Sequence, residues 1–175
     1  MWDIRPVTSE DVSGAVAVVQ GVFQEYGFRW EDGDYYADLY DPLTHYPAPG
    51  GFWVAIVDEK IVGTVGLDVF DPLPGGESPP VPTRFDGRIR VSGVDCSLER
   101  LYLLAEHRGK GLGKALFQTA ITEAKEKGRR RMEIWSDKLF APAHSLYGLF
   151  GAVIVADRLC DDPDESPEWG LSLDL

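Results

Sequence analysis

The feature that most constrains this chain is a predicted strand at residues 96–104 that runs into a glycine-rich turn and then into a long helix at residues 111–128. The turn has glycine at positions 109, 111 and 113. Because glycine adopts positive φ and carries no side chain, successive backbone N–H groups of such a turn can converge on one anion. The N-terminus of the following helix adds a partial positive charge. The segment therefore predicts a phosphate-binding turn.

The charge of this turn is opposite in sign to that of the chain. Residues 106–114 contain Arg108, Lys110 and Lys114 against Glu106, a net charge of +2. The 175 residues together have 17 basic and 29 acidic side chains, a net charge of −12, and a sequence pI near 4.6. Such a chain lacks the basic face that binds DNA or RNA, so we expect no nucleic-acid partner. The acidic field favours a cationic small molecule.

The common nucleotide-binding motifs do not fit the turn. The phosphate loop of nucleotide triphosphatases needs glycine where Arg108 stands and a hydroxyl residue where Ala115 stands. The dinucleotide pattern G-x-G-x-x-G needs a third glycine at position 114 or 116, and these positions hold Lys114 and Leu116. Both motifs are therefore excluded.

Hydrophobic periodicity predicts a single α/β domain with a mixed sheet over residues 1–175. The predicted strands are residues 2–7, 52–57, 60–67, 96–104, 132–135, 153–155 and 169–173, and the predicted helices are residues 11–26, 30–40, 111–128 and 142–150. The pair Asp58-Glu59 joins two of these strands as a hairpin. Residues 71–95 hold five prolines and four glycines, which predicts a long surface loop with a short strand at residues 88–91.

Cysteine usage and the N-terminus point to a cytoplasmic protein. Cys96 and Cys160 match neither a disulfide framework nor a metal-binding pattern, so we expect reduced thiols and no metal. The first residues, MWDIRPVTSEDV, lack the basic and then apolar order of a signal peptide. No apolar run approaches the length of a membrane span, so we expect no membrane partner.

The pattern Arg-x-x-Gly-x-Gly at Arg108, Gly111 and Gly113 does fit, because it directly follows a strand and opens a helix. It resembles the coenzyme A pyrophosphate motif of the GNAT superfamily of N-acetyltransferases. Leu-Tyr-Leu at 101–103 precedes the motif, and Ala-His-Ser-Leu-Tyr-x-x-x-Gly at 143–151 follows it at similar spacing. The order of elements over nearly the whole chain resembles that family as well. The alternative is a glycine turn that serves the fold and binds no ligand.

The resemblance implies a mostly antiparallel sheet of about seven strands flanked by about four helices, with acetyl-CoA as co-substrate. In the family, the strand before the motif splays from its neighbour and its backbone pairs with the pantetheine arm, a role that falls on Leu101 and Leu103. The pyrophosphate would lie on the amides of Gly109, Lys110, Gly111, Gly113 and Lys114, with the charges of Arg108, Lys110 and Lys114 assisting. Phe140 stands where the family often has an asparagine that contacts the cofactor, which puts that one contact in doubt.

The resemblance also implies direct transfer of an acetyl group to a primary amine, with Tyr147 as the general acid that protonates the departing thiolate. The amine must first become neutral, which costs an alkylammonium ion about 4 to 5 kcal/mol at pH 7. The family's glutamate base usually stands where this chain has Ser97. Glu99 lies two residues further on the same strand face and is our candidate base. Glu133 or a chain of water molecules are the alternatives.

For the acceptor, the resemblance indicates the first two helices and the 71–95 segment. We expect substrate contacts from Trp30, Tyr35, Tyr36 and His144, and an amine pocket that also includes Glu31, Asp32 and Asp34. A small-molecule amine is the expected acceptor. Acetylation of protein N-termini or lysines, or a sensor that binds acyl-CoA without turnover, are the alternatives. Members of the family are often dimers, so a homodimer is compatible with the resemblance.

Overall fold

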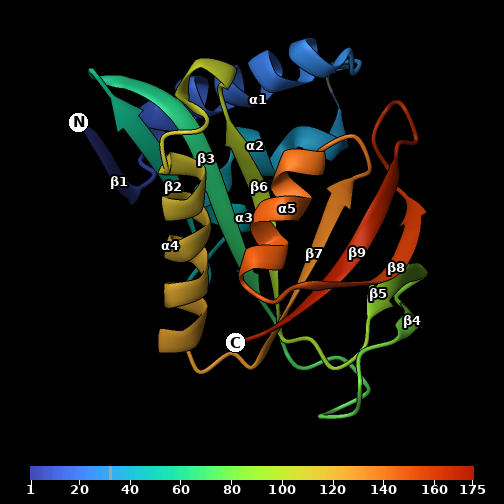
Figure 1. The fold of residues 1–175 in the computed structure, drawn as a ribbon. Coiled ribbons are helices and arrows are strands. Elements are labelled where there is room, and N and C mark those ends of the chain that lie inside the picture. Colours follow the sequence, from blue (N-terminus) through green and yellow to red (C-terminus); the bar gives the residue numbers. More distant parts are fainter. Residues whose placement is uncertain (32) are drawn as a thin grey trace.

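The computed structural model describes residues 1–31 and 33–175, and its main feature is a seven-stranded sheet in the order β1-β2-β3-β6-β7-β9-β8 (Figure 1). The strands are β1 (Trp2–Pro6), β2 (Gly51–Val57), β3 (Lys60–Val69), β6 (Cys96–Leu103), β7 (Arg131–Asp137), β8 (Val153–Leu159) and β9 (Pro167–Asp174). Only the β6–β7 pair within this sheet is parallel. The predicted mixed sheet is confirmed.

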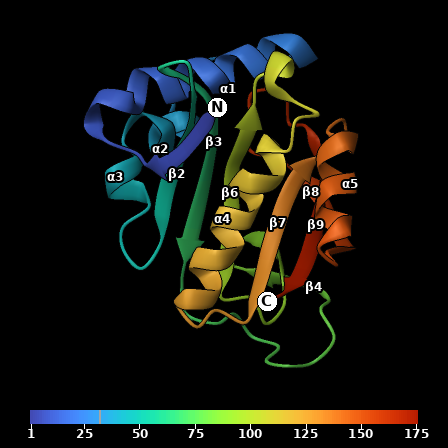
Figure 2. The same cartoon turned by 60° about the vertical axis from the view of Figure 1, so that its left-hand side comes forward.

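Helices cover both faces of the sheet. They are α1 (Val12–Tyr26), α2 (Ala37–Tyr40), α3 (Pro42–His45), α4 (Leu112–Glu126) and α5 (Ala141–Leu149). Figure 1 shows α4 and α5 in front of the sheet, and Figure 2 shows α2 and α3 on the far side of the sheet from α4. Strand β2 alternates accordingly: Phe52 and Val54 pack with α1 and α2, whereas Trp53 and Ala55 pack with α4. Both faces of the sheet are thus buried, and each face contributes to its own hydrophobic cluster.

The helix predicted at residues 30–40 is confirmed only in its second half, over residues 34–40. The chain forms a 3₁₀ turn at Asp34–Tyr36 and then the short α2, and Pro42 begins α3. A residue before proline is kept out of the helical region, and Asp41 accordingly has φ −144° and ψ 63°. Proline suits the first turn of a helix, where its missing N–H has no partner to lose, and the Asp41 side chain accepts the Thr44 amide.

The 71–95 segment contains more structure than the sequence predicts. Besides the expected strand β5 (Arg88–Val91) it forms β4 (Pro82–Phe85), and the two make an antiparallel hairpin. Its turn, Asp86-Gly87, has φ of 47° and 77°, the left-handed conformation of a tight hairpin turn. Val91 and Val94 pack with Leu73 in a small apolar cluster, against which Trp135 of β7 and Val155 of β8 also pack. We call residues 82–91 the inserted hairpin.

Strands β6 and β7 pair over only part of their length, and this opens the sheet at its centre. Their pairs run from Cys96–Met132 to Leu98–Ile134, although both strands continue beyond this point. Just past the last pair, β6 has a bulge in which Val65 of β3 opposes two residues, Arg100 and Leu101. Arg100 has φ 47°, and such a bulge bends its strand.

Candidate active site

A cavity of about 1010 Å³ lies where β6 and β7 diverge. Its wall includes ten of the residues predicted from the sequence: Tyr35, Glu99, Leu101, Leu103, Arg108, Gly109, Gly111, Gly113, Lys114 and Tyr147. Trp30, Tyr36, Lys110 and His144 are not part of this wall. The cavity therefore joins the glycine turn at one end to the candidate acid and base further in.

At the glycine turn, two of the three glycines are needed by the backbone. Gly109 and Gly111 have φ of 72° and 87°, which side chains disfavour. Gly113 lies in the first turn of α4, and a Cβ there would meet only Leu103 Cδ2, at 3.6 Å, among the described residues beyond its chain neighbours. The lack of a side chain at Gly113 thus keeps the cavity wall open above the helix N-terminus, without serving the backbone itself.

The basic side chains of the turn are used in different ways. Arg108 donates from Nη1 and Nη2 to the two carboxylate oxygens of Glu25, each at 2.7 Å, and from Nε to the Leu103 carbonyl at 2.8 Å. It therefore ties the turn to the C-terminal end of α1. Lys110 donates to the Glu106 carbonyl. Lys114 lines the cavity and makes no ion pair with the described residues.

The candidate acid, Tyr147, is 4% exposed and packs its ring against Phe117, with the centroids 5.0 Å apart. It projects from α5 into the wall of the cavity. Burial raises the pKa of Tyr147 above its ordinary value, because the phenolate would be poorly solvated. The hydroxyl consequently keeps its proton near neutral pH and can donate it.

The candidate base, Glu99, lies on β6 just before the bulge. Burial is the main cause that raises the pKa of Glu99, the charges of Asp38 and Asp68 add to it, the charge of Arg100 opposes it, and the net value is about 7. The Ser97 hydroxyl acts against this shift by donating to Glu99 Oε1 at 2.5 Å. A carboxylate with this pKa can accept a proton near neutral pH, which suits a general base.

Glu133, the alternative base, is engaged elsewhere. It is 1% exposed on β7, accepts Arg90 Nε at 2.5 Å and accepts the Val91 amide at 3.0 Å. Both partners belong to the inserted hairpin. Glu133 thus fixes that hairpin to the sheet, and Glu99 is the better placed of the two to exchange a proton.

A buried ion pair joins the bulge of β6 to α2. Arg100 binds Asp38 of α2 through Nε at 2.9 Å and Nη2 at 2.8 Å, and it also donates to the Tyr35 carbonyl. Tyr46 donates to the same Asp38 carboxylate. Sequence reasoning missed Asp38, since its partner Arg100 is distant in the chain. Arg100, a charged residue within an apolar strand, was the available signal.

Of the predicted acceptor residues, Tyr35 lines the cavity, whereas Trp30, Tyr36 and His144 do not. The Tyr35 hydroxyl accepts from the Cys160 thiol at 3.4 Å. Tyr36 is fully buried and stacks on Trp30 with a centroid distance of 3.9 Å, so these two rings support the wall from the core. His144 binds the Ser136 hydroxyl at 3.0 Å, and burial lowers the pKa of this imidazole.

Of the acidic residues expected near these rings, Asp34 lines the cavity and Glu31 pairs with Arg29. Asp32 lies outside the described residues. Phe140 lines the cavity and packs on Tyr26 at 4.8 Å. Its position in the wall is therefore filled by an aromatic ring and not by a hydrogen-bonding amide.

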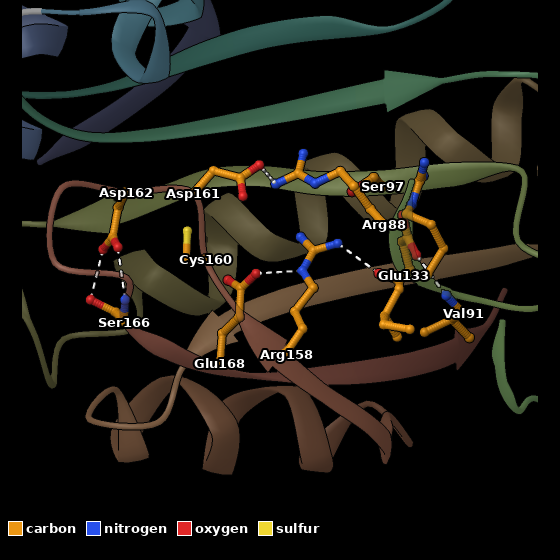
Figure 3. A network of polar contacts seen from close by, with 12 residues as sticks. Arg88, Val91, Ser97, Glu133, Arg158, Cys160, Asp161, Asp162, Ser166 and Glu168 are labelled. Atoms are coloured by element: carbon orange, nitrogen blue, oxygen red, sulfur yellow. Dashed lines mark hydrogen bonds and ion pairs between the residues drawn. The ribbon is translucent and has the colours of Figure 1, made fainter. Parts of the chain in front are cut away.

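The far end of the cavity is lined by arginine–carboxylate pairs, shown in Figure 3. Arg158 donates to Glu168 at 2.6 Å and to the Ile89 carbonyl of the inserted hairpin at 2.8 Å. Arg88 pairs with Asp161 at 2.5 Å. Together with Arg90–Glu133, these pairs attach the inserted hairpin to strands β7, β8 and β9. No local sequence pattern predicts the Arg88–Asp161 and Arg90–Glu133 pairs, because each joins residues far apart in the chain.

Within the described ranges, no group of three or more His, Cys, Asp or Glu side chains is arranged to hold a metal ion. In the same part of the chain, no helix is long and apolar enough to cross a membrane.

Comparisons with known proteins agree with this geometry. Residues 16–152 match the model of the acetyltransferase (GNAT) family. The chain is 30% identical over 151 residues to an uncharacterized N-acetyltransferase, YjgM, of Escherichia coli, covering 85% of this chain and 80% of that protein. It is 32% identical over 126 residues to human N-acetyltransferase 8B, covering 70% of this chain and 48% of that protein, so it spans about half of this human relative.

Solved structures show the same fold. A GNAT acetyltransferase from Staphylococcus aureus superposes with a TM-score of 0.75 at 19% identity, covering 100% of this chain and 99% of that one. The Salmonella typhimurium protein yncA, solved with acetyl-CoA, superposes with a TM-score of 0.67 at 19% identity, covering 100% of this chain and 94% of that one. With the family match and the relatives above, the chain belongs to the GNAT family and is an acetyl-CoA-dependent N-acetyltransferase.

Proposed function

We propose that this enzyme transfers the acetyl group of acetyl-CoA to the primary amine of a small molecule by direct attack of the amine on the thioester. The observation that carries the proposal is that Glu99 and Tyr147 line one cavity, which also reaches the glycine turn. The same cavity thus has a base with a pKa of about 7, Glu99, and a hydroxyl that keeps its proton, that of Tyr147.

The cofactor would enter at the glycine turn. The amides of residues 109–114 and the N-terminus of α4 suit its pyrophosphate, and Lys114 is the cation beside them. The pantetheine arm would follow β6 past the point where β7 leaves it, along the main chain of Leu101. The Leu103 carbonyl already accepts a hydrogen bond from Arg108, so we assign it a smaller part than Leu101 in binding the pantetheine arm.

The chemical steps can be assigned to the two side chains. Glu99 removes one proton from the ammonium group, and the neutral amine attacks the thioester carbonyl to form the C–N bond. The C–S bond then breaks, and the thiolate takes the proton of the Tyr147 hydroxyl. The second proton lost by the nitrogen returns to Tyr147, and the proton on Glu99 passes to solvent.

Two contacts favour a small acceptor over a protein. Arg29, between α1 and α2, donates from Nε and from its backbone amide to Asp164 of the β8–β9 loop, each at 2.7 Å. These bonds lower the pKa of the Asp164 carboxyl and join two segments that border the cavity. On the opposite side, the inserted hairpin is fixed by Glu133 and Arg158. An extended peptide would have to displace one of these borders.

The test measures release of free thiol from acetyl-CoA with a panel of primary amines. Wild-type protein should turn over at least one small amine. Tyr147→Phe should lower kcat by about tenfold or more, since general acid catalysis is worth at least that much. Acetyl-CoA at 100 times its Kd should still add about 2.7 kcal/mol to the stability of the variant. Unchanged kcat would remove Tyr147 as the acid, and binding without turnover of any amine would favour the sensor.

A further inference from the structure

We infer that Asp68 is a specificity-determining residue that binds a second positive charge on the acceptor, so that the preferred acceptor is a diamine or another primary amine with a further cationic group. This inference rests on the proposed function, because it concerns the acceptor end of the same cavity. It goes further by naming the chemistry of the substrate and the residue that selects it.

The strand register places Asp68 beside the reaction site. Asp68 on β3 is directly opposite Ser97 on β6, and Ser97 is opposite Glu133 on β7. Paired residues project from the same face of a sheet, and Glu99 projects from that face as well because it is two residues from Ser97. Asp68, Ser97, Glu99 and Glu133 all line the cavity. The carboxyl groups of Asp68 and Glu99 are thus diagonal neighbours on adjacent strands.

The arginines around this end of the cavity are paired with carboxylates other than Asp68 and Glu99. Each arginine at this end already holds a carboxylate: Arg88 holds Asp161, Arg90 holds Glu133, Arg100 holds Asp38 and Arg158 holds Glu168. Among the described residues, Asp68 and Glu99 have no basic side chain within ion-pair distance.

Asp68 itself is partly removed from water. Burial raises the pKa of Asp68, the Val69 amide and the charge of Arg90 act against this shift, and the charge of Glu133 adds to it. Since Arg90 is bound by Glu133, its charge is not free to pair with Asp68. A carboxylate in this position costs folding free energy unless a cation arrives to bind it. When the reacting amine is at Glu99, a second ammonium group on a short chain would reach Asp68.

An acceptor carboxylate does not fit this end equally well. It would have to displace Asp161, Glu133 or Glu168 from an arginine, and it would lie among the remaining carboxylates. The same four-carbon chain can therefore serve as the probe with three different ends: 1,4-diaminobutane has a second positive charge, butylamine has none, and 4-aminobutanoate has a negative one.

The experiment measures kcat/KM for these three amines with saturating acetyl-CoA. We expect the order diamine, then butylamine, then 4-aminobutanoate. Asp68→Asn should lower kcat/KM for the diamine by about tenfold or more, mainly through KM, because a charged hydrogen bond is lost. On the plateau above the acid limb, its kcat/KM for butylamine should change by less than about twofold, because butylamine has no second charge for Asp68 to bind. Because Asp68 raises the pKa of Glu99, the acid limb of the butylamine pH profile should also move to lower pH in this variant.

Asp71→Asn is the matched control, since Asp71 is exposed, follows β3 by two residues and does not line the cavity. It should leave all three values unchanged. Equal use of butylamine and diamine by the wild type, preference for 4-aminobutanoate, or equal losses in the two variants would overturn the inference and leave the proposed function standing. If acetyl-CoA binds but no amine is acetylated, the proposed function fails with it. Even if Asp68→Asn does not fold, the comparison of the three amines on wild-type protein tests whether a second positive charge on the acceptor is preferred.

Discussion

Glu99, the proposed general base, has a raised pKa that also affects the stability of the fold. Its ordinary pKa of 4.5 applies in the unfolded chain, whereas burial raises it to about 7 in the folded protein. The folded state therefore binds the Glu99 proton more tightly than the unfolded state. By linkage, the contribution of Glu99 to stability is fully present below about pH 4.5 and is lost as the pH rises through 7.

Replacing Glu99 by Gln should separate these two effects. The variant cannot ionise at this position, so it should gain up to about 3 kcal/mol of stability over the wild type at pH 8 and little at pH 5. Its kcat should fall by about 100-fold, and the acid limb of the rate profile near pH 7 should disappear. Chemical unfolding at the two pH values measures the change in stability, and a pH–rate profile measures the change in kcat. A stability difference that does not depend on pH would contradict the shifted pKa.

At the scale of elements, the glycine turn and α4 are readable from the sequence because their information is local. The same holds for the β2–β3 hairpin, whose Asp58 and Glu59 adopt the positive φ of a tight turn. Asp68 was missed because the predicted strand stopped at residue 67, one residue before it. The pairs Arg100–Asp38 and Arg90–Glu133 depend on tertiary packing, which no local sequence pattern predicts.

Gly113→Asp should separate cofactor binding from stability at the start of α4. An acidic side chain in the first turn of a helix favours the helix by roughly 0.3 to 1 kcal/mol, and the free protein has room for it. The same charge would repel the pyrophosphate of acetyl-CoA. We expect unchanged or raised thermal stability without ligand, and loss of the several-degree rise in Tm with acetyl-CoA.

The matched control is Ser13→Asp, which adds the same charge at the second residue of α1, outside the cavity. It should keep the full response to acetyl-CoA. If Gly113→Asp kept that response too, the pyrophosphate would not lie at this turn.

At the scale of the molecule, the net charge of −12 acts on the two substrates in opposite directions. Acetyl-CoA is an anion that must approach an acidic protein, whereas an ammonium acceptor is drawn to it. The Debye length falls from about 30 Å at 0.01 M salt to about 8 Å at 0.15 M. Added salt should therefore lower the KM for acetyl-CoA and raise the KM for the amine. Steady-state kinetics at the two salt concentrations test this, and parallel changes would show that local contacts outweigh the overall field.

The inserted hairpin also has a consequence for how such an enzyme can diverge. Its Val91 packs with Leu73 and Val94 in a small apolar cluster against Trp135 and Val155 of the sheet, and polar bonds from Glu133 and Arg158 also hold the hairpin there. The glycine turn, where we propose that the pyrophosphate binds, lies in a different segment of the chain. Exchange of this one insertion would therefore remodel the acceptor end and leave the acetyl donor's half intact, so that new acceptors can evolve without a new donor site.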